Sequence, residues 1–359
     1  MNLIYPDYYP KFQCLAGACP DTCCKDWQII LDPDTLARYR ALPGELGERV
    51  RASLVEEDGE TRFAVQGGHC PLLAADGLCD IQRALGEDAL CRTCGSHPRF
   101  SEIYGLTEEQ SLSVSCPAAA RLLLERTVPV RFVHDTDERP LDGLNDLDPA
   151  LYRALDRARS FAIRLVQDRR LPPPDRLALL LLFAKRMQGL LDEDRCDRAG
   201  RLIAQFSSDT YLHRQRTRLS RLRGCRGSFM PLWLLLRNME HLTQRFPALL
   251  EAALHTAPPR DFWRSYGTQM ENLCVYFLFR YFKKAVNDRQ LLPRVYACVF
   301  HLLAVRQLFA AQEENSLDAL IRVCSLYSKE VEHSEENLAL LQRTFARRAL
   351  TGRALIRLL

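Results

Sequence analysis

The sequence lacks any apolar run long enough to cross a bilayer. Its longest apolar blocks, residues 177–184 and 232–236, each end at a basic residue and fall far short of the ~20 residues that a transmembrane helix needs. Residues 1–12 carry Asp7 before the first basic side chain, Lys11, and have no apolar segment of the kind that forms a secretory signal. We therefore expect a cytoplasmic protein that does not span a membrane.

The composition excludes disordered, collagen-like and low-complexity proteins. The 359 residues are 47% hydrophobic and 26% charged, which suffices for an ordinary buried core in about two domains at ~150 residues each. The net charge of +4 is unevenly spread, because residues 1–120 contain 10 basic and 18 acidic side chains. Basic residues in the remainder alternate with Asp and Glu, which favours a solvated helical surface and no nucleic-acid partner.

Cysteine is the residue type in excess, and it is concentrated near the N-terminus. The chain has 14 cysteines. Nine of them lie in the first 116 residues: Cys14, Cys19, Cys23, Cys24, Cys70, Cys79, Cys91, Cys94 and Cys116. Disulfides are disfavoured, because this number is odd and the chain is long enough to fold without them. The cluster therefore indicates a metal site.

Two kinds of metal centre remain open. Structural zinc takes four Cys or His ligands, typically as two short pairs, and only Cys91 and Cys94 form such a pair. An iron–sulfur cluster also takes thiolates and tolerates irregular spacing. The excess of cysteines favours iron–sulfur, or more than one metal site, with zinc as the alternative.

Chain geometry limits which thiols can share one metal ion. The adjacent side chains of Cys23 and Cys24 diverge in most backbone conformations, so both do not easily bind one tetrahedral ion. The spacing C-x3-C-x2-C is not met, because Cys19 and Cys23 are followed at the third position by Asp26. Spacing alone therefore does not predict radical chemistry.

Other residues of this region have ordinary interpretations. His69 and His97 stand beside cysteines, but we expect both to be surface or loop histidines, since the thiols already outnumber the needs of one site. Phe12 and Trp27 are expected to pack around the metal, because small metal modules have few other apolar residues for a core.

The rest of the chain contains the start and stop signals of a series of helices. Asp148 before Pro149 predicts a helix to about Arg169, and the prolines at 172–174 separate it from the next. Further helices are predicted at 198–222, 231–254, 260–286, 291–312, 316–332 and 335–357. Short strands are predicted at 61–66 and 128–133. We expect a mainly α protein: a small, loop-rich, Cys-rich metal-binding module with minor β at 1–125, followed by an irregular α-helical bundle at 126–359.

Five cysteines and a row of aromatic residues lie within the predicted helices. The five isolated cysteines lack partner spacing and are expected to be small buried residues: Cys196, Cys225, Cys274, Cys298 and Cys324. The aromatic residues suit a substrate cleft or, more simply, a helix core. They are Tyr276, Phe277, Phe279, Tyr281 and Phe282.

Several long strings resemble one protein family. The first is C-x4-C-x3-CC-x2-W with Asp32 and Thr35 downstream, and the second is CPLL-x3-GLC-x-IQ-x2-LGE-x2-LC-x-TC-x3-PR. The C-terminal strings MENLCVYFLFRYF and YSKEVEHSEENL extend the likeness. Together they resemble the bacterial flagellin lysine N-methylase family, whose cysteine-rich domain is described as zinc- or iron-chelating. The likeness covers both ends of the chain, and residues ~125–255 match by helical character alone.

The resemblance implies an enzyme with two cofactors. It implies methyl transfer from S-adenosylmethionine to the lysine ε-amines of flagellin, in a cytoplasmic protein that holds a [4Fe–4S] cluster. By position it makes the nine early cysteines the candidate cluster environment. The alternative is a non-enzymatic module in which zinc or iron staples the N-terminal fold while the helices bind a protein partner.

The glycine-rich pattern of common S-adenosylmethionine enzymes is absent. Gly44 and Gly47 follow no β-run, whereas the usual cofactor loop follows a first strand. The cofactor pocket is therefore expected at the metal module or among helices. Direct transfer needs a neutral lysine amine, hence a desolvating pocket or a base. Glu271, Glu330 and Glu332 are candidate bases, although we expect each on a solvated helix face.

Overall fold

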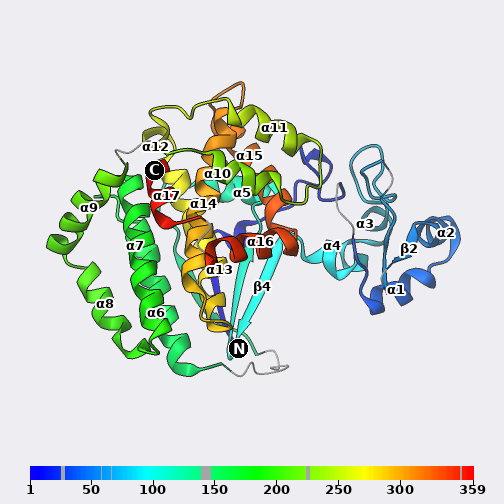
Figure 1. Cartoon of the computed structure of the whole chain (residues 1–359). Coiled ribbons are helices and arrows are strands. Elements are labelled where there is room, and N and C mark those ends of the chain that lie inside the picture. Colours follow the sequence, from blue (N-terminus) through cyan, green and yellow to red (C-terminus); the bar gives the residue numbers. More distant parts are fainter. Residues whose placement is uncertain (26–28, 58, 66, 139–146, 224–226, 348–349) are drawn as a thin grey trace.

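The protein is mainly helical, with two small sheets (Figure 1). The computed structural model describes residues 1–25, 29–57, 59–65, 67–138, 147–223, 227–347 and 350–359. These residues contain 17 α-helices and six strands, which confirms the predicted class. A small N-terminal unit stands to one side of a larger helical body.

The N-terminal unit, residues 29–96, has its own small core. Its elements are α1 (Pro33–Arg40), α2 (Gly44–Ala52), β2 (Leu54–Glu57), β3 (Glu60–Phe63), α3 (Asp80–Leu85) and α4 (Arg92–Ser96). The core residues are Ile29, Leu31, Tyr39, Val50, Phe63, Cys70, Leu72, Ile81 and Cys91. The predicted strand at 61–66 corresponds to β3, which pairs with β2 in an antiparallel hairpin. Two thiols are thus part of the apolar core itself.

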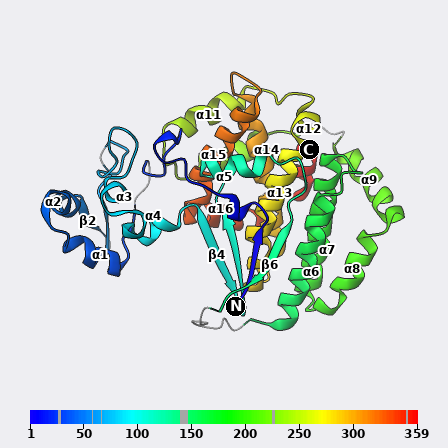
Figure 2. The ribbon, with the colours of Figure 1, turned by 180° about the vertical axis from the view of Figure 1, so that it is seen from behind.

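A four-stranded sheet joins the N-terminus to the helical body. Its strands are β1 (Asn2–Pro6), β4 (Arg99–Tyr104), β5 (Thr107–Leu112) and β6 (Phe132–Thr136), in the order β4-β5-β1-β6. Strand β1 runs parallel to β5 and antiparallel to β6. From behind, the sheet lies between the N-terminal unit and helices α6–α9 (Figure 2).

The sequence predicted only part of this sheet. Strand β6 begins four residues after the start of the predicted strand at 128–133. Strand β5 was missed because its sequence, TEEQSL, is polar, although Glu108 and Glu109 are buried in it. Buried carboxylates break the polar-to-apolar alternation from which a strand is predicted.

Helices form the larger body. They are α5 (Pro117–Leu124), α6 (Pro149–Val166), α7 (Pro173–Asp192), α8 (Ala199–Phe206), α9 (Asp209–Arg223), α10 (Met230–Arg237), α11 (Arg245–Leu254), α12 (Phe262–Ser265), α13 (Gly267–Tyr281), α14 (Leu291–Ala310), α15 (Leu317–Glu332), α16 (Glu335–Ala346) and α17 (Gly352–Leu358). The 3-10 turns are η1 (Tyr9–Lys11), η2 (Ala16–Ala18), η3 (Glu87–Ala89), η4 (Cys196–Arg198) and η5 (Phe282–Val286). One continuous core contains residues of both the sheet and these helices.

The helix starts were easier to predict than the breaks. Asp148 caps α6 as expected, since its carboxylate accepts hydrogen bonds from the backbone N–H groups of Ala150 and Leu151. The predicted helices 198–222, 231–254, 260–286 and 335–357 are each interrupted in the structure. At the third break, Gly267 packs against Pro173, where an added Cβ would lie 2.8 Å from the proline Cγ. This close approach depends on tertiary packing, which a local pattern does not contain.

Helix α14 is the central element of the body. It is long and apolar enough to cross a membrane, with a mean hydropathy of 1.2 over its best window, but 78% of that window is buried inside the protein. It packs against α7, α13, α15 and α16. An all-round apolar helix of this kind is typical of a protein core.

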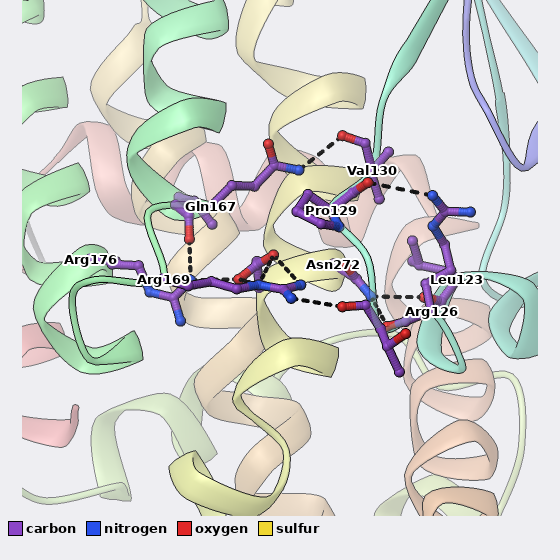
Figure 3. A network of polar contacts seen from close by, with 11 residues as sticks. Leu123, Arg126, Pro129, Val130, Gln167, Arg169, Arg176 and Asn272 are labelled. Carbon is purple, nitrogen blue, oxygen red and sulfur yellow. Dashed lines mark hydrogen bonds and ion pairs between the residues drawn. The ribbon is translucent and has the colours of Figure 1, made fainter.

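A buried carboxylate on α13 ties three segments together. Glu271 accepts hydrogen bonds from Arg169, at 2.9 Å for the shortest, and from Nη1 of Arg176 at 2.6 Å. Arg169 also donates to the carbonyl oxygen of Thr127 (Figure 3). The neighbouring Asn272 donates to two carbonyl oxygens of the 123–126 segment. Helix α13, the α6–α7 connection and the end of α5 are thereby fixed to one another.

A second buried network ties the sheet to the helices. Glu109 of β5 pairs with both Arg159 of α6 and Lys283 of η5, whose Nζ lies 2.8 Å from the carboxylate. Lys283 also donates to the hydroxyl of Tyr152 and lies over the Tyr152 and Tyr104 rings at 4.3 and 4.9 Å. Carboxylates and aromatic rings thus replace the water that this buried side chain loses.

The Glu271 network predicts a large loss of stability on truncation. We expect Glu271→Ala to lower the free energy of unfolding by about 3–5 kcal/mol, because Arg176, which is buried, would keep its charge without a partner. The measurement is urea unfolding followed by circular dichroism. Glu251→Ala, which removes an exposed carboxylate on α11, is the control and should change stability by about 0.5 kcal/mol or less. Equal effects would contradict the assignment.

His301 predicts a pH dependence of stability. It is buried on α14, its Nδ1 lies 2.7 Å from the Tyr327 hydroxyl, and burial lowers its pKa to about 3. The unfolded histidine, with a pKa near 6.5, takes up a proton as the pH falls, whereas the folded one stays neutral. From pH 7.5 to 5.5 this histidine should therefore subtract about 1.4 kcal/mol of stability.

The test compares the pH dependence of unfolding in two variants. His301→Gln should lose this part of the pH dependence, whatever its stability at pH 7.5. His213→Gln, which changes an exposed histidine on α9, should keep it. Retention of the full dependence in His301→Gln would show that this histidine is not held neutral.

Candidate functional site

The nine early cysteines lie in two neighbouring groups that meet at Cys23 and Cys24. The inner group borders the small core of the N-terminal unit and contains Cys24, Cys70, Cys79, Cys91 and Cys94. The junction group faces the helical body and contains Cys14, Cys19, Cys23 and Cys116. The two adjacent residues fall in different groups, but their thiols are hydrogen-bonded to each other, so the predicted divergence of the two side chains is not observed.

Burial and hydrogen bonds between thiols shift the pKa values of the inner group. Burial, with a smaller effect of charge on the neighbouring Cys24, Cys79 and Cys91, raises the pKa of Cys70 to about 12. The Cys94 thiol donates to Cys91, which lowers the pKa of Cys91 to about 7 and raises that of Cys94.

Asp32 and Thr35, from the first family-like string, hold this part of the unit together. The Asp32 carboxylate caps α1 through the N–H of Thr35 at 3.0 Å. It also accepts the N–H of Arg92, at the start of α4, at 2.9 Å. Since Arg92 follows Cys91 directly, this carboxylate fixes the position of the Cys91–Cys94 pair.

The junction thiols lie between the N-terminal unit and the body. The Cys23 thiol donates to Cys24, which raises the pKa of Cys23 and lowers that of Cys24 to about 6. Burial raises the pKa of Cys116, and the nearby Cys19 and Cys14 act in the same direction. Cys116 is the N-cap residue of α5, so this group is anchored to the core of the larger body.

The cysteine thiols are suitable ligands for a metal, but their observed arrangement is not that of a metal site. All 13 cysteines among the described residues are free thiols. Within those residues, no group of three or more His, Cys, Asp or Glu side chains is placed to hold a metal ion. Thiolates are nevertheless the ligands of iron–sulfur clusters and of structural zinc, and each group offers at least four. Which thiols ligate a metal stays a prediction.

A buried polar cluster lies next to the junction thiols. Glu332, at the end of α15, accepts hydrogen bonds from the hydroxyls of Tyr276 at 3.0 Å, Tyr281 at 2.6 Å and Ser328 at 2.6 Å. Arg280 pairs with the same carboxylate at 3.1 Å. Burial raises the pKa of both tyrosines, so their hydroxyls stay protonated donors. We call these five residues the Glu332 cluster.

Aromatic rings enclose the guanidinium of this cluster. The Arg280 Cζ lies 4.3 Å from the centre of the Phe100 ring, and 5.4 Å from those of Tyr276 and Tyr281. Phe100 belongs to β4, so the sheet supplies one wall of the cluster. Stacking on rings replaces part of the water that a buried guanidinium loses.

Short contacts connect the Glu332 cluster to the thiols. His333 follows Glu332, and its Nε2 lies 2.7 Å from the hydroxyl of Ser115, the residue before Cys116. The His97 ring lies 6.1 Å from that of His333. Burial lowers the pKa of His333 to about 3 and that of His97 to about 4, so both rings are neutral at physiological pH.

Lys329 adds a buried positive charge that acts on the junction thiol Cys19 and on the two histidines. Its Nζ lies 3.8 Å from Asp21, and its side chain is 5% exposed. Its charge lowers the pKa values of His97 and His333 and opposes the burial that raises the pKa of Cys19. A cation in this position favours thiolates over thiols.

The three candidate bases are all buried, so the expectation of solvated helix faces was wrong. Glu271 is committed to the network of Figure 3. Glu330 accepts the backbone N–H groups of Leu242 and Thr243 and fixes a loop, and burial raises its pKa. Glu332 is the one of the three whose chain neighbour, His333, contacts the residue before Cys116.

Other predictions for single residues had mixed outcomes. His69 is exposed as expected, and His97 lies in the turn between α4 and β4, where it is half-buried. Phe12 packs in the larger core, beneath Arg99, and not around the small one. Cys274, Cys298 and Cys324 are buried as predicted, whereas Cys196 is half-buried. Trp27 and Cys225 lie outside the described residues.

Sequence reasoning named Glu332, Tyr276 and Tyr281 separately, but it missed Arg280 and Ser328 and did not bring the five residues together, although signals for the cluster exist. Tyr276 and Arg280 are four residues apart on α13, as are Ser328 and Glu332 on α15, and residues with this spacing share a helix face. Both pairs fall within the family-like C-terminal strings. Polar residues on one face of an otherwise apolar helix are the signal that could have identified the cluster.

Comparison with known proteins bears on the larger part of the chain. Residues 159–354 match the FliB lysine N-methylase C-terminal domain. The flagellar biosynthetic protein FliU of Salmonella muenchen is 31% identical over 167 residues, which cover 44% of this chain and 94% of FliU. No solved structure matches the chain.

Two relatives carry the name lysine-N-methylase. They come from Salmonella typhimurium strain LT2 and Salmonella choleraesuis strain SC-B67, and each is 34% identical over 126 residues. The match covers 33% of this chain and 31% of each relative, so it spans less than a third of their length. The domain match, by contrast, covers more than half of the chain, and the match to FliU covers nearly all of that protein. As the cysteine-rich and C-terminal strings predicted, the chain belongs to the FliB lysine N-methylase family.

Proposed function

We propose that this protein is a protein-lysine N-methyltransferase that uses S-adenosylmethionine as methyl donor and flagellin as substrate. Membership of the lysine N-methylase family supports the reaction class, and the flagellar name of FliU supports the substrate. The observation that carries the proposal is the contact between His333, which follows Glu332, and Ser115, which precedes Cys116, because it links the Glu332 cluster to the junction group. Free thiols suit a reducing cytoplasm.

We assign the [4Fe–4S] cluster to the junction group, Cys14, Cys19, Cys23 and Cys116. These thiols lie beside Lys329 and His333, close to the Glu332 cluster. The inner group then serves the fold of the N-terminal unit, with zinc as an alternative metal for either group. Bound by all four of these thiolates, an iron–sulfur cluster would supply a one-electron redox centre.

Proton removal is the task we assign to the chain's own residues. A lysine ammonium must lose a proton before its nitrogen can attack the sulfonium methyl carbon. The new N–C bond forms as the C–S bond breaks, leaving S-adenosylhomocysteine and methylated lysine. Glu332 is placed to accept the proton, and the hydroxyls of Tyr276 and Tyr281 orient its carboxylate.

The test of the function is a labelled-methyl assay on anaerobically purified protein. Iron and zinc are quantified, and the protein is incubated with S-adenosylmethionine labelled at its methyl group and with flagellin. Iron together with label on flagellin lysines is the expected result. Stoichiometric zinc with no transfer would favour the stapled protein-interaction module instead.

Glu332→Gln tests the proposed base, and its folding is checked by circular dichroism because the change also removes the carboxylate partner of Arg280. Loss of the base predicts methyl transfer that is about 10²- to 10⁴-fold slower, with unchanged metal content. Glu330→Gln, which alters an equally buried carboxylate of the same helix, is the matched control and should retain activity. The proposal for Glu332 fails if both variants keep wild-type rates, or if both lose them together with the metal.

The division of the thiols predicts how metal content responds to mutation. Cys116→Ala should abolish bound iron, because it removes one ligand of the assigned set. Cys91→Ala combined with Cys94→Ala should destabilise the N-terminal unit. Cys298→Ala, which alters a buried core thiol on α14, should retain full iron. Iron analysis by atomic emission decides this, and equal loss of iron in Cys116→Ala and Cys298→Ala would overturn the assignment.

A further inference from the structure

A large groove on the helical body lies apart from the thiols and the Glu332 cluster. It runs between α7, α8 and α9 on one side and α14 and α17 on the other, and it encloses about 1570 Å³. This volume exceeds the ~300–1,000 Å³ of a typical small-molecule pocket. In Figure 1, α8 and α9 stand on the side of the body opposite to the N-terminal unit.

Basic side chains dominate the polar lining of this groove. Seven exposed cations line it: Arg221 and the six residues Lys185, Arg186, Arg198, Arg201, Arg218 and Arg353. Within the described residues, none of these six forms an ion pair. The two carboxylates of the lining already have partners, since Asp192 accepts a hydrogen bond from Gln188 and Glu193 lies 3.5 Å from Arg195.

The arginines of α9 differ in whether they pair with a carboxylate of the protein. Arg216 and Arg223 turn toward the body and pair with the buried carboxylate of Asp175. Arg218, on the same helix, lines the groove. Arg216 and Arg223 thus have a carboxylate partner inside the protein, whereas Arg218 forms no ion pair with any of the described residues.

The rest of the lining fits a polypeptide. Leu202 and Leu219 form part of an apolar floor, and the amides of Gln205 and Gln215 can pair with a peptide backbone. The two aromatic residues of the lining, Tyr296 and Phe345, are buried. They offer no exposed ring on which a base could stack, as single-stranded nucleic acid requires.

We infer that this groove binds an acidic segment of a polypeptide partner. Carboxylates of the segment pair with the groove cations, and its apolar side chains cover the leucine floor. Charge complementarity of this kind sets the encounter rate and the orientation of a partner. The inference goes beyond the proposed function, because docking in the groove needs neither a metal nor methyl transfer.

The experiment measures fluorescence anisotropy of a labelled peptide with the full-length protein. The probes are a ten-residue Glu/Ala peptide, a Lys/Ala peptide of the same length and a single-stranded oligonucleotide of matched charge. We expect the Glu/Ala peptide to bind more tightly than the other two, and more weakly as salt rises. No binding of the acidic peptide, or tighter binding of the oligonucleotide, would overturn the inference.

A pair of double variants locates the binding. Arg201→Ala with Arg218→Ala should weaken peptide binding about fivefold or more, because two uncompensated cations leave the groove. Arg245→Ala with Arg260→Ala removes two exposed arginines that do not line the groove and should leave the affinity unchanged. Equal weakening in both, with both proteins folded, would show non-specific attraction and overturn the inference.

Discussion

Buried charges along one segment hold this structure together. Between Gly267 and Val286 the chain carries Glu271, Arg280 and Lys283, and each forms an ion pair with little access to water. Removing a charge from water costs several kcal/mol unless a partner of opposite sign is in place. Each of the three therefore fixes a different neighbour: the α6–α7 connection, the end of α15, and strand β5.

This constraint also explains where the candidate site forms. The pair between Arg280 and Glu332 fixes the end of α15 against α13, and β4 adds Phe100 over the guanidinium. His333, next along the chain, then reaches Ser115 beside Cys116. The polar cluster and the junction thiols are thus held close together by the same contacts that fold the body. A methyltransferase needs such proximity, because donor and acceptor must meet in one water-poor space.

Local patterns in the sequence were enough to predict the mainly helical class, the clustering of cysteines and the protein family. The cap at Asp148 predicted the start of α6, and the ordered cysteine strings predicted a family that an independent domain match confirms. Contacts between distant residues could not be predicted. Glu109 finds its partners Arg159 and Lys283 at separations of 50 and 174 residues, so β5 looked like a polar loop. Glu332 likewise looked solvated, because Arg280 is 52 residues away.

The central claim is that the methyl donor meets the acceptor lysine at the junction between the thiols and Glu332. Electron–nuclear double resonance on the reduced, iron-loaded protein tests this most directly, with S-adenosylmethionine carrying ¹³C in its methyl group. The account predicts a ¹³C coupling to the paramagnetic cluster. A cluster signal with no ¹³C coupling would place the donor elsewhere and contradict the account.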